Sequence, residues 1–149
     1  HEASRLTVRR PQNTEQAQYS LPFAVAALLV HGRLGPAELS GAALAQPQVL
    51  DLAERVELVE DAAFCARYPA ERVSRVEIET TAGERLDSGE VKPDWDVTDP
   101  PTDDDLRQKF RWLAAVRLPE ARAAALEDAA WRCDSLPDAG QINRLLADN

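Results

Sequence analysis

The feature that most restricts the fold of this chain is a run of ten apolar residues, Leu21–Val30, without a charged or hydrogen-bonding side chain. A membrane span needs about 20 such residues, so this run predicts a helix buried inside the protein, with other elements on all sides. Pro22 is disfavoured inside a helix because it lacks an amide hydrogen. We therefore expect the helix to begin anew after Ser20 as N-cap rather than to kink, and to end at Gly32.

Three further helical segments are expected around this one. Asn13 or Thr14 can cap a short preceding helix, and the residues that follow resemble a capping box. Gly35–Leu39 has a proline near its start and predicts a single helical turn. Pro47 is expected to open a helix that extends to about Val56.

Alternation of apolar and polar residues predicts a small antiparallel sheet. Val56–Val59, Val73–Thr80 and Glu84–Leu86 alternate with the period of two that is typical of strands. The last two segments flank a turn at Ala82–Gly83, which indicates a hairpin. Ala62–Pro69 is expected to be irregular. We expect the helix after Ser20 to cover the sheet.

The C-terminal third reads as helical. Pro93–Pro101 is rich in Asp and Pro and predicts a linker. Thr102 before three aspartates is a strong start for a helix to about Val116, because a hydroxyl cap and carboxylates both suit the positive end of a helix. Pro119–Cys133 predicts a long alanine-rich helix, and Ile142–Leu146 a short last one.

These elements define an α+β fold: a small antiparallel sheet with a buried helix, followed by an all-helical C-terminal tail. We place the domain boundary between residues 93 and 94. Residues 1–93 would form the α+β domain, cut short at its N-terminus because His1–Arg10 has no start-like character, and residues 94–149 would form the tail.

The charge restricts the kinds of partner that we expect for this chain, and the cysteine content restricts the expected cellular compartment. A formal net charge of −9 argues against nucleic acid and against an anionic membrane surface. Cys65 and Cys133 form no metal-binding or disulfide pattern, which fits a reducing cytoplasm. The first ten residues lack the apolar core of a signal peptide.

Few residues suggest catalysis on their own. Tyr19 and Ser20 stand where a polar turn meets the apolar helix, so they and nearby amides could line a site for an anion. The alternative, which the residues alone favour, is an ordinary cap at Ser20 and a packing role for Tyr19. His31 is expected to touch the carbonyls at the helix end. Consecutive aspartates at 103–105 point around a helix and suggest no metal.

Four segments, in order, resemble the C-terminal part of the MmgE/PrpD family. Pro11–Gly32 (PQNTEQAQYSLPFAVAALLVHG) is similar to the helix signature of the family's second domain. Gln46–Val56 resembles a helix that leads into a strand, and Val76–Gly83 resembles the family's hairpin. Pro101–Phe110 is similar to a later "P-x-s-x-x-e-L-x-x-K-F" segment. Together they cover nearly the whole chain.

The resemblance implies a cytoplasmic two-domain enzyme whose large N-terminal helical domain, missing from this sequence, carries much of the active site. The α+β part would cover the substrate, the last helices would pack on the helical domain, and the enzyme would be a homodimer without a cofactor. Known members include 2-methylcitrate dehydratase, cis-aconitate decarboxylase and iminodisuccinate epimerase, which act on small polycarboxylates by proton transfer.

This chain is therefore expected to be the C-terminal portion of a 2-methylcitrate dehydratase-like lyase and to be inactive alone. A related epimerase, isomerase or decarboxylase remains an alternative, as does a non-catalytic or partner-dependent module. Dehydratase-like and decarboxylase-like members often carry Tyr where this chain has Phe23. Phe cannot donate a hydrogen bond, so Tyr19, one helical turn earlier, is the candidate to replace that donor. Tyr19 and Ser20 are the expected catalytic residues, and Phe23, Arg33 and Lys92 the expected substrate-binding residues.

Overall fold

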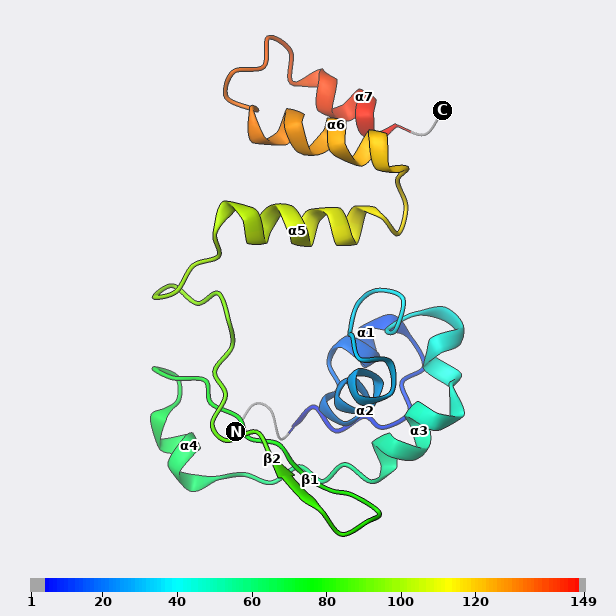
Figure 1. Ribbon diagram of the computed structural model, residues 1–149, viewed down its shortest axis with the longest axis vertical. Helices are drawn as coiled ribbons and strands as arrows, with labels where there is room; N and C mark the ends of the chain where they lie inside the picture. Colours follow the sequence, from blue (N-terminus) through cyan, green and yellow to red (C-terminus); the bar gives the residue numbers. More distant parts are fainter. Residues whose placement is uncertain (1–4, 148–149) are drawn as a thin grey trace. The chain divides into compact units, whose positions relative to one another are not determined.

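A computed structural model describes residues 5–147 and divides the chain into two compact units, His1–Asp99 and Pro100–Asn149 (Figure 1). Residues 1–4, the first part of the segment His1–Arg10, lie outside the described residues. Helices and one antiparallel pair of strands make up the regular structure of the described chain, which confirms the α+β class. None of the helices between residues 5 and 147 is both long and apolar enough to cross a membrane.

Short helices dominate the first unit, and side chains cap several of them. Asn13 accepts the amide hydrogen of Gln16 at 2.8 Å, and Ser20 accepts that of Phe23 at 3.0 Å. Gly32 ends the second helix with φ of 69°, a backbone conformation that glycine adopts without steric cost. The predicted restart at Ser20 is thus confirmed. The helices of this unit are α1 Thr14–Gln18, α2 Leu21–His31, η2 Gly41–Ala45, α3 Pro47–Glu54 and α4 Ala62–Arg67.

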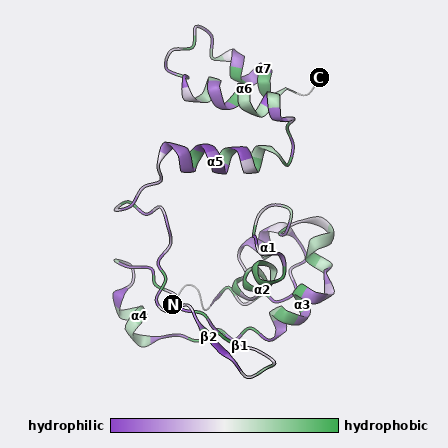
Figure 2. Ribbon diagram, viewed as in Figure 1, coloured by the Kyte–Doolittle hydropathy of each residue, from purple (hydrophilic) through white to green (hydrophobic). Residues whose placement is uncertain are grey.

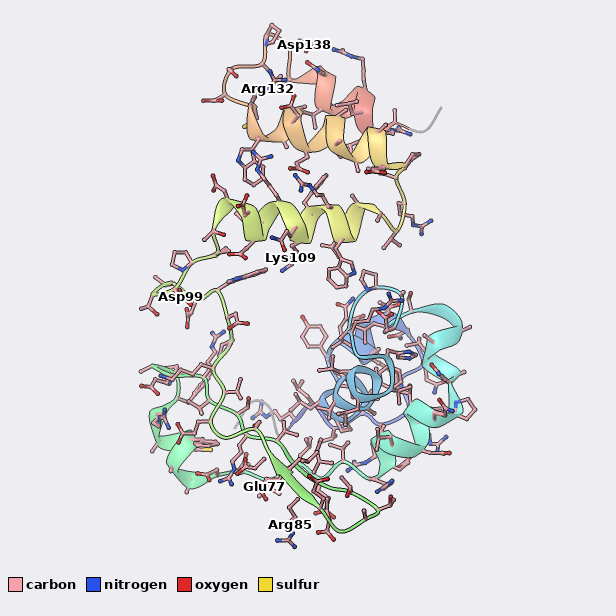
Figure 3. The ribbon with its side chains drawn as sticks, viewed as in Figure 1. Glu77, Arg85, Asp99, Lys109, Arg132 and Asp138 are labelled. Carbon is pink, nitrogen blue, oxygen red and sulfur yellow. The ribbon has the colours of Figure 1, made fainter. Side chains whose placement is uncertain are left out.

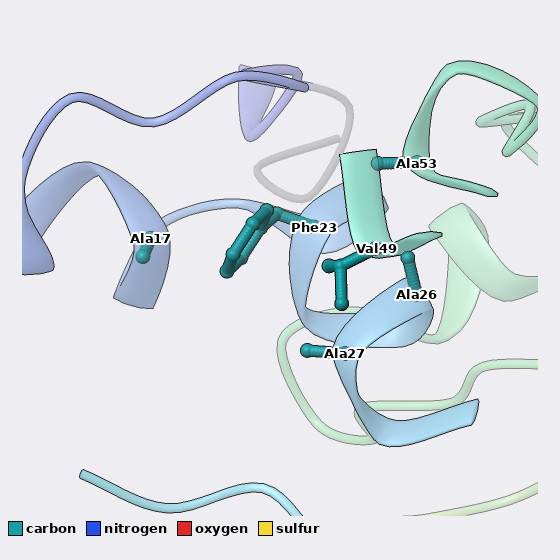
Figure 4. Close-up of a cluster of buried hydrophobic side chains, with 6 residues drawn as sticks. All are labelled: Ala17, Phe23, Ala26, Ala27, Val49 and Ala53. Atoms are coloured by element: carbon teal, nitrogen blue, oxygen red, sulfur yellow. The ribbon is translucent and has the colours of Figure 1, made fainter. Parts of the chain in front are cut away.

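The core of the first unit lies where α2 packs on α3 (Figure 4). Alanines on both helices permit close approach of the two backbones, and Phe23 is the largest side chain that is fully buried. The cluster consists of Ala17, Phe23, Ala26, Ala27, Val49 and Ala53.

The prediction that α2 is surrounded on all sides is wrong. Leu28 and Leu29 are 47% and 49% exposed, although Figure 2 shows hydrophobic residues along most of the helix. In the described chain α2 has α3 and α1 as its main helical neighbours, and these cover one side of it. The apolar composition of α2 predicts that the helix is buried on every side, because composition does not reveal how many other elements pack against it.

The sheet is smaller than predicted. Strand β1, Glu77–Glu79, pairs antiparallel with β2, Arg85–Asp87, with Ile78 opposite Leu86. The predicted turn is present, with Gly83 at φ of 80°. Val56–Val59 is not a strand, because the carbonyl of Val56 accepts a hydrogen bond from Arg9 Nη2 at 2.7 Å instead of from a neighbouring strand.

Two other expectations for this unit are wrong. Ala62–Arg67 forms α4 rather than an irregular segment, because Asp61 accepts the amide hydrogens of Ala63 and Phe64 and so caps a helix. The hairpin is not covered by α2, since Val76 and Leu86, on its apolar side, are 40% and 46% exposed. The packing side of α2 is already occupied by α3.

Three helices form the second unit. Helix α5, Asp103–Ala114, begins at the Thr102 cap that the sequence predicts, and Asp105 completes a capping box with Thr102. Helix α6, Glu120–Trp131, packs against both α5 and α7, Gly140–Leu146 (Figure 1). All three predicted helices of the tail are present. Between residues 100 and 147, the buried side chains all lie on α6: Ala123, Leu126, Glu127 and Ala129.

Candidate functional site

The junction between α1 and α2 holds two of the five predicted site residues side by side. Ser20 is 2% exposed, and its hydroxyl both accepts from the amide of Phe23 and donates to the carbonyl of Val8. The amide of Leu21 donates to the carbonyl of Leu6 at 3.0 Å. These bonds attach the segment before α1 to the first turn of α2.

The amides at the start of α2 are all engaged within the protein. Leu21 donates to Leu6, Phe23 to the Ser20 hydroxyl, and Ala24 to the Ser20 carbonyl at 3.2 Å. Pro22 carries no amide hydrogen. An anion at this helix start would therefore find no free backbone donor, and the suggested wall of amides is not available in this arrangement.

Tyr19 differs from its neighbour because its side chain is 64% exposed while its backbone is fixed. Its amide donates to the carbonyl of Glu15 at 3.1 Å and ends α1. The phenol can donate or accept a hydrogen bond. At this junction, Tyr19 is the predicted site residue that can reach a ligand in solvent.

Phe23, one helical turn after Tyr19, is fully buried in the α2–α3 core (Figure 4). The ring contributes to packing and presents no surface to solvent.

Arg33 lies just beyond the other end of α2, about 20 Å along the helix from Ser20. Its Nε donates to Glu38 Oε1 at 2.7 Å, and the other oxygen of Glu38 accepts the amide hydrogen of Gly35 at 3.0 Å. The hydrogen bond from Arg33 lowers the pKa of the buried Glu38 carboxyl, although burial opposes this effect. The guanidinium thus already has a carboxylate partner. His31, the last residue of α2, is exposed.

Lys92 belongs to a second charged group, near α4. Its ammonium lies 3.2 Å from Glu71, which also pairs with Arg67. Arg67 in turn contacts Glu90 at 2.8 Å. Hydrogen bonds from Arg67 and then Lys92 lower the pKa of Glu71. Lys92, like Arg33, is held by carboxylates of the protein.

A charged cluster between α5 and α6 was not predicted from the sequence. Glu127 is 4% exposed and accepts hydrogen bonds at 2.7 Å from Arg107 and Arg111. Arg107 also lies 4.1 Å from the centre of the Trp131 ring, within the range of a cation–π interaction. The bonds from Arg111 and Arg107 lower the pKa of Glu127 to about 2. The spacing of the two arginines by four residues, on one side of a helix, was the available signal.

The aspartates at the start of α5 serve the helix. Asp105 accepts from the Thr102 backbone at 2.9 Å and hydrogen-bonds its hydroxyl at 2.6 Å, which lowers the pKa of its carboxyl. Among residues 5–147, no three acidic, His or Cys side chains converge as a metal site would require.

The structure defines a helix-rich α+β protein with an exposed phenol at a fixed helix junction and with both candidate cations, Arg33 and Lys92, paired with carboxylates. The chain belongs to the MmgE/PrpD family, since residues 1–134 match the MmgE/PrpD C-terminal domain. The search against curated proteins found no match.

Proposed function

We propose that this chain is the C-terminal portion of a 2-methylcitrate dehydratase-like lyase, which acts on a small di- or tricarboxylate by proton transfer. The match of residues 1–134 to the C-terminal domain of the family carries the proposal. In it, residues 1–93 cover the substrate, and residues 94–149 pack on a helical domain that this sequence does not contain. The enzyme is cytoplasmic and homodimeric.

Tyr19 is the residue that we expect to meet the substrate. An exposed phenol can hydrogen-bond a substrate carboxylate or transfer a proton. The backbone of Tyr19 is already held at the end of α1, so the backbone loses little conformational freedom when a ligand binds. Ser20, Phe23, Arg33 and Lys92 already have partners or are buried, so any of them would have to exchange a present contact for one to substrate.

The chain alone is proposed to be inactive. Proton abstraction beside a carboxylate needs a positioned base, and cationic groups must neutralise the substrate. The two cations proposed for this role are paired with Glu38 and Glu71. The helical domain would supply the base and further cations.

A non-catalytic module is the second candidate, and the occupied partners of Ser20, Arg33 and Lys92 favour it. An epimerase, isomerase or decarboxylase of the same family would use the same surface and differ in the reaction.

One experiment separates these candidates. The chain alone, and the chain mixed with an N-terminal helical domain of the family, are incubated with 2-methylcitrate, cis-aconitate or iminodisuccinate, and products are followed by proton NMR. We expect turnover in the mixture only, lost on Tyr19→Phe. Which substrate reacts identifies the reaction. Turnover by the chain alone would refute the proposal that it is inactive alone, and unchanged rates for Tyr19→Phe would remove Tyr19 from the site.

A further inference from the structure

The Ser20 hydroxyl occupies a position that links two parts of the first unit. It donates to the carbonyl of Val8, which belongs to the segment before α1, and it accepts from Phe23 in the first turn of α2. Because Ser20 is 2% exposed, a substrate in solvent cannot contact this hydroxyl. Its effect on any ligand must pass through a neighbour.

That neighbour is Tyr19, which lies between two anchored points. On one side, its own amide is bonded to Glu15 and closes α1. On the other side, Ser20 is held by its hydroxyl, and the next residue, Leu21, is held through its amide to Leu6. The peptide that carries the exposed phenol is therefore fixed at both ends.

The segment that receives these bonds is itself anchored at its far end. Arg9 donates to the carbonyl of Val56, and Arg10 lies 2.7 Å from Glu54, the last residue of α3. The segment thus connects the start of α2 to the end of α3, whose packing against α2 forms the core. The Ser20 hydroxyl joins Tyr19 to this rigid framework.

We infer that Ser20 is a positioning residue, which sets the orientation of Tyr19 by bonding the start of α2 to the segment that contains Val8. The importance of Tyr19 for a carboxylate substrate rests on the proposed function. The orientation of Tyr19 is tested separately, without a ligand. As an ordinary N-cap, Ser20 needs only the hydrogen bond that its hydroxyl accepts from the Phe23 amide. As a positioning residue, it also needs the hydrogen bond that its hydroxyl donates to the Val8 carbonyl.

The test uses the whole chain labelled with 3-fluorotyrosine. Tyr19 and Tyr68 give two fluorine resonances, which Tyr19→Phe assigns. Ser20→Ala should displace or broaden the Tyr19 resonance and leave that of Tyr68 unchanged, and Ser20→Thr, which keeps a hydroxyl, should restore it. Ser20→Gly is the second variant, because glycine is tolerated at an N-cap at a cost of only a few tenths of a kcal/mol. It removes both hydroxyl bonds, the one to Val8 and the one from Phe23, with little effect on helix stability.

Thr102→Ala is the matched control, because it also deletes a capping hydroxyl, but in the other unit. It should lower the melting temperature without moving the Tyr19 resonance. If Ser20→Gly and Ser20→Ala leave the Tyr19 resonance in place, Ser20 is a cap and the inference is refuted. Failure of Tyr19→Phe to affect turnover would instead refute the proposed function and leave the positioning result intact.

Discussion

Arg111 binds Glu127 through two parallel hydrogen bonds, each 2.7 Å long, from Nε and Nη2 to the two carboxylate oxygens. The pair joins α5 to α6, and the carboxylate is buried whereas the guanidinium is mostly exposed. A bidentate pair of this kind fixes the relative orientation of the two side chains and also brings their opposite charges together.

This pair predicts how the second unit responds to acid. The pKa of Glu127 is lowered from 4.5 to about 2, so the folded state binds a proton less readily than the unfolded state. The stabilisation is complete above pH 4.5 and is lost as the pH falls toward 2. Glu127→Gln should lower the melting temperature at pH 7 and weaken its acid dependence. Thermal scans by circular dichroism from pH 7 to 2 check this, with the exposed Glu120→Gln as control; identical pH profiles would contradict it.

The α2–α3 core predicts a large effect at one side chain. Phe23→Ala should cost about 3–5 kcal/mol, because it leaves a cavity among alanines too small to fill it. Leu28→Ala, on the exposed side of the same helix, should cost far less, on the order of 0.5 kcal/mol. Urea unfolding of both variants provides the comparison. Equal losses would mean that the outer side of α2 is covered in solution.

The capping box at Thr102 predicts a local effect. Thr102→Ala should destabilise α5 by about 1 kcal/mol, because the amide of Asp105 loses its acceptor. It should also raise the pKa of Asp105, which the Thr102 hydrogen bonds lower. Carboxyl NMR titration measures that pKa, with Asp103→Asn as a comparison that keeps the cap. A pKa of Asp105 that stays unchanged in Thr102→Ala would show that the hydroxyl is not the cause.

The outer side of α5 predicts self-association of the chain. Leu106, Trp112, Leu113 and Val116 are 39–50% exposed. Figure 3 shows Lys109 on the side of α5 turned away from α6, and Leu113 follows it by one helical turn. Such an apolar strip favours association. Sedimentation velocity should show mass rising with concentration, and Leu113→Lys should reduce this more than Arg132→Glu, a charge change between α6 and α7. A sharply monomeric species at all concentrations would rule it out.

Local chemistry made some elements predictable. Ser20, Gly32 and Thr102 mark helix ends through bonds to residues three or four positions away, so sequence alone reveals them. The α4 helix could have been found in the same way, because Asp61 precedes an alanine-rich stretch. The strand at Val56–Val59 could not be excluded locally, since the competing bond comes from Arg9, far away in the sequence.

The candidate site also combines features that the sequence predicts with features that it does not. The adjacency of Tyr19 and Ser20 is covalent and therefore certain, whereas their opposite exposures depend on the path of residues 6–8 beside α2. The partner of Lys92 is a carboxylate beside α4, and nothing near Lys92 in the sequence indicates it.

On the hairpin, Glu79 and Arg85 do pair at 3.3 Å, as neighbours across a turn would, and Figure 3 shows Arg85 extending outward.

The arrangement of α6 between α5 and α7 has a consequence for the rate of folding. The main helix contacts of this unit join helices that follow one another in the chain, α5 with α6 and α6 with α7. Contacts between near neighbours require little loop closure, and helical units of this kind fold in microseconds to milliseconds. The three helices are therefore expected to associate as soon as α7 has been synthesised, well before any slower step elsewhere in the protein is complete.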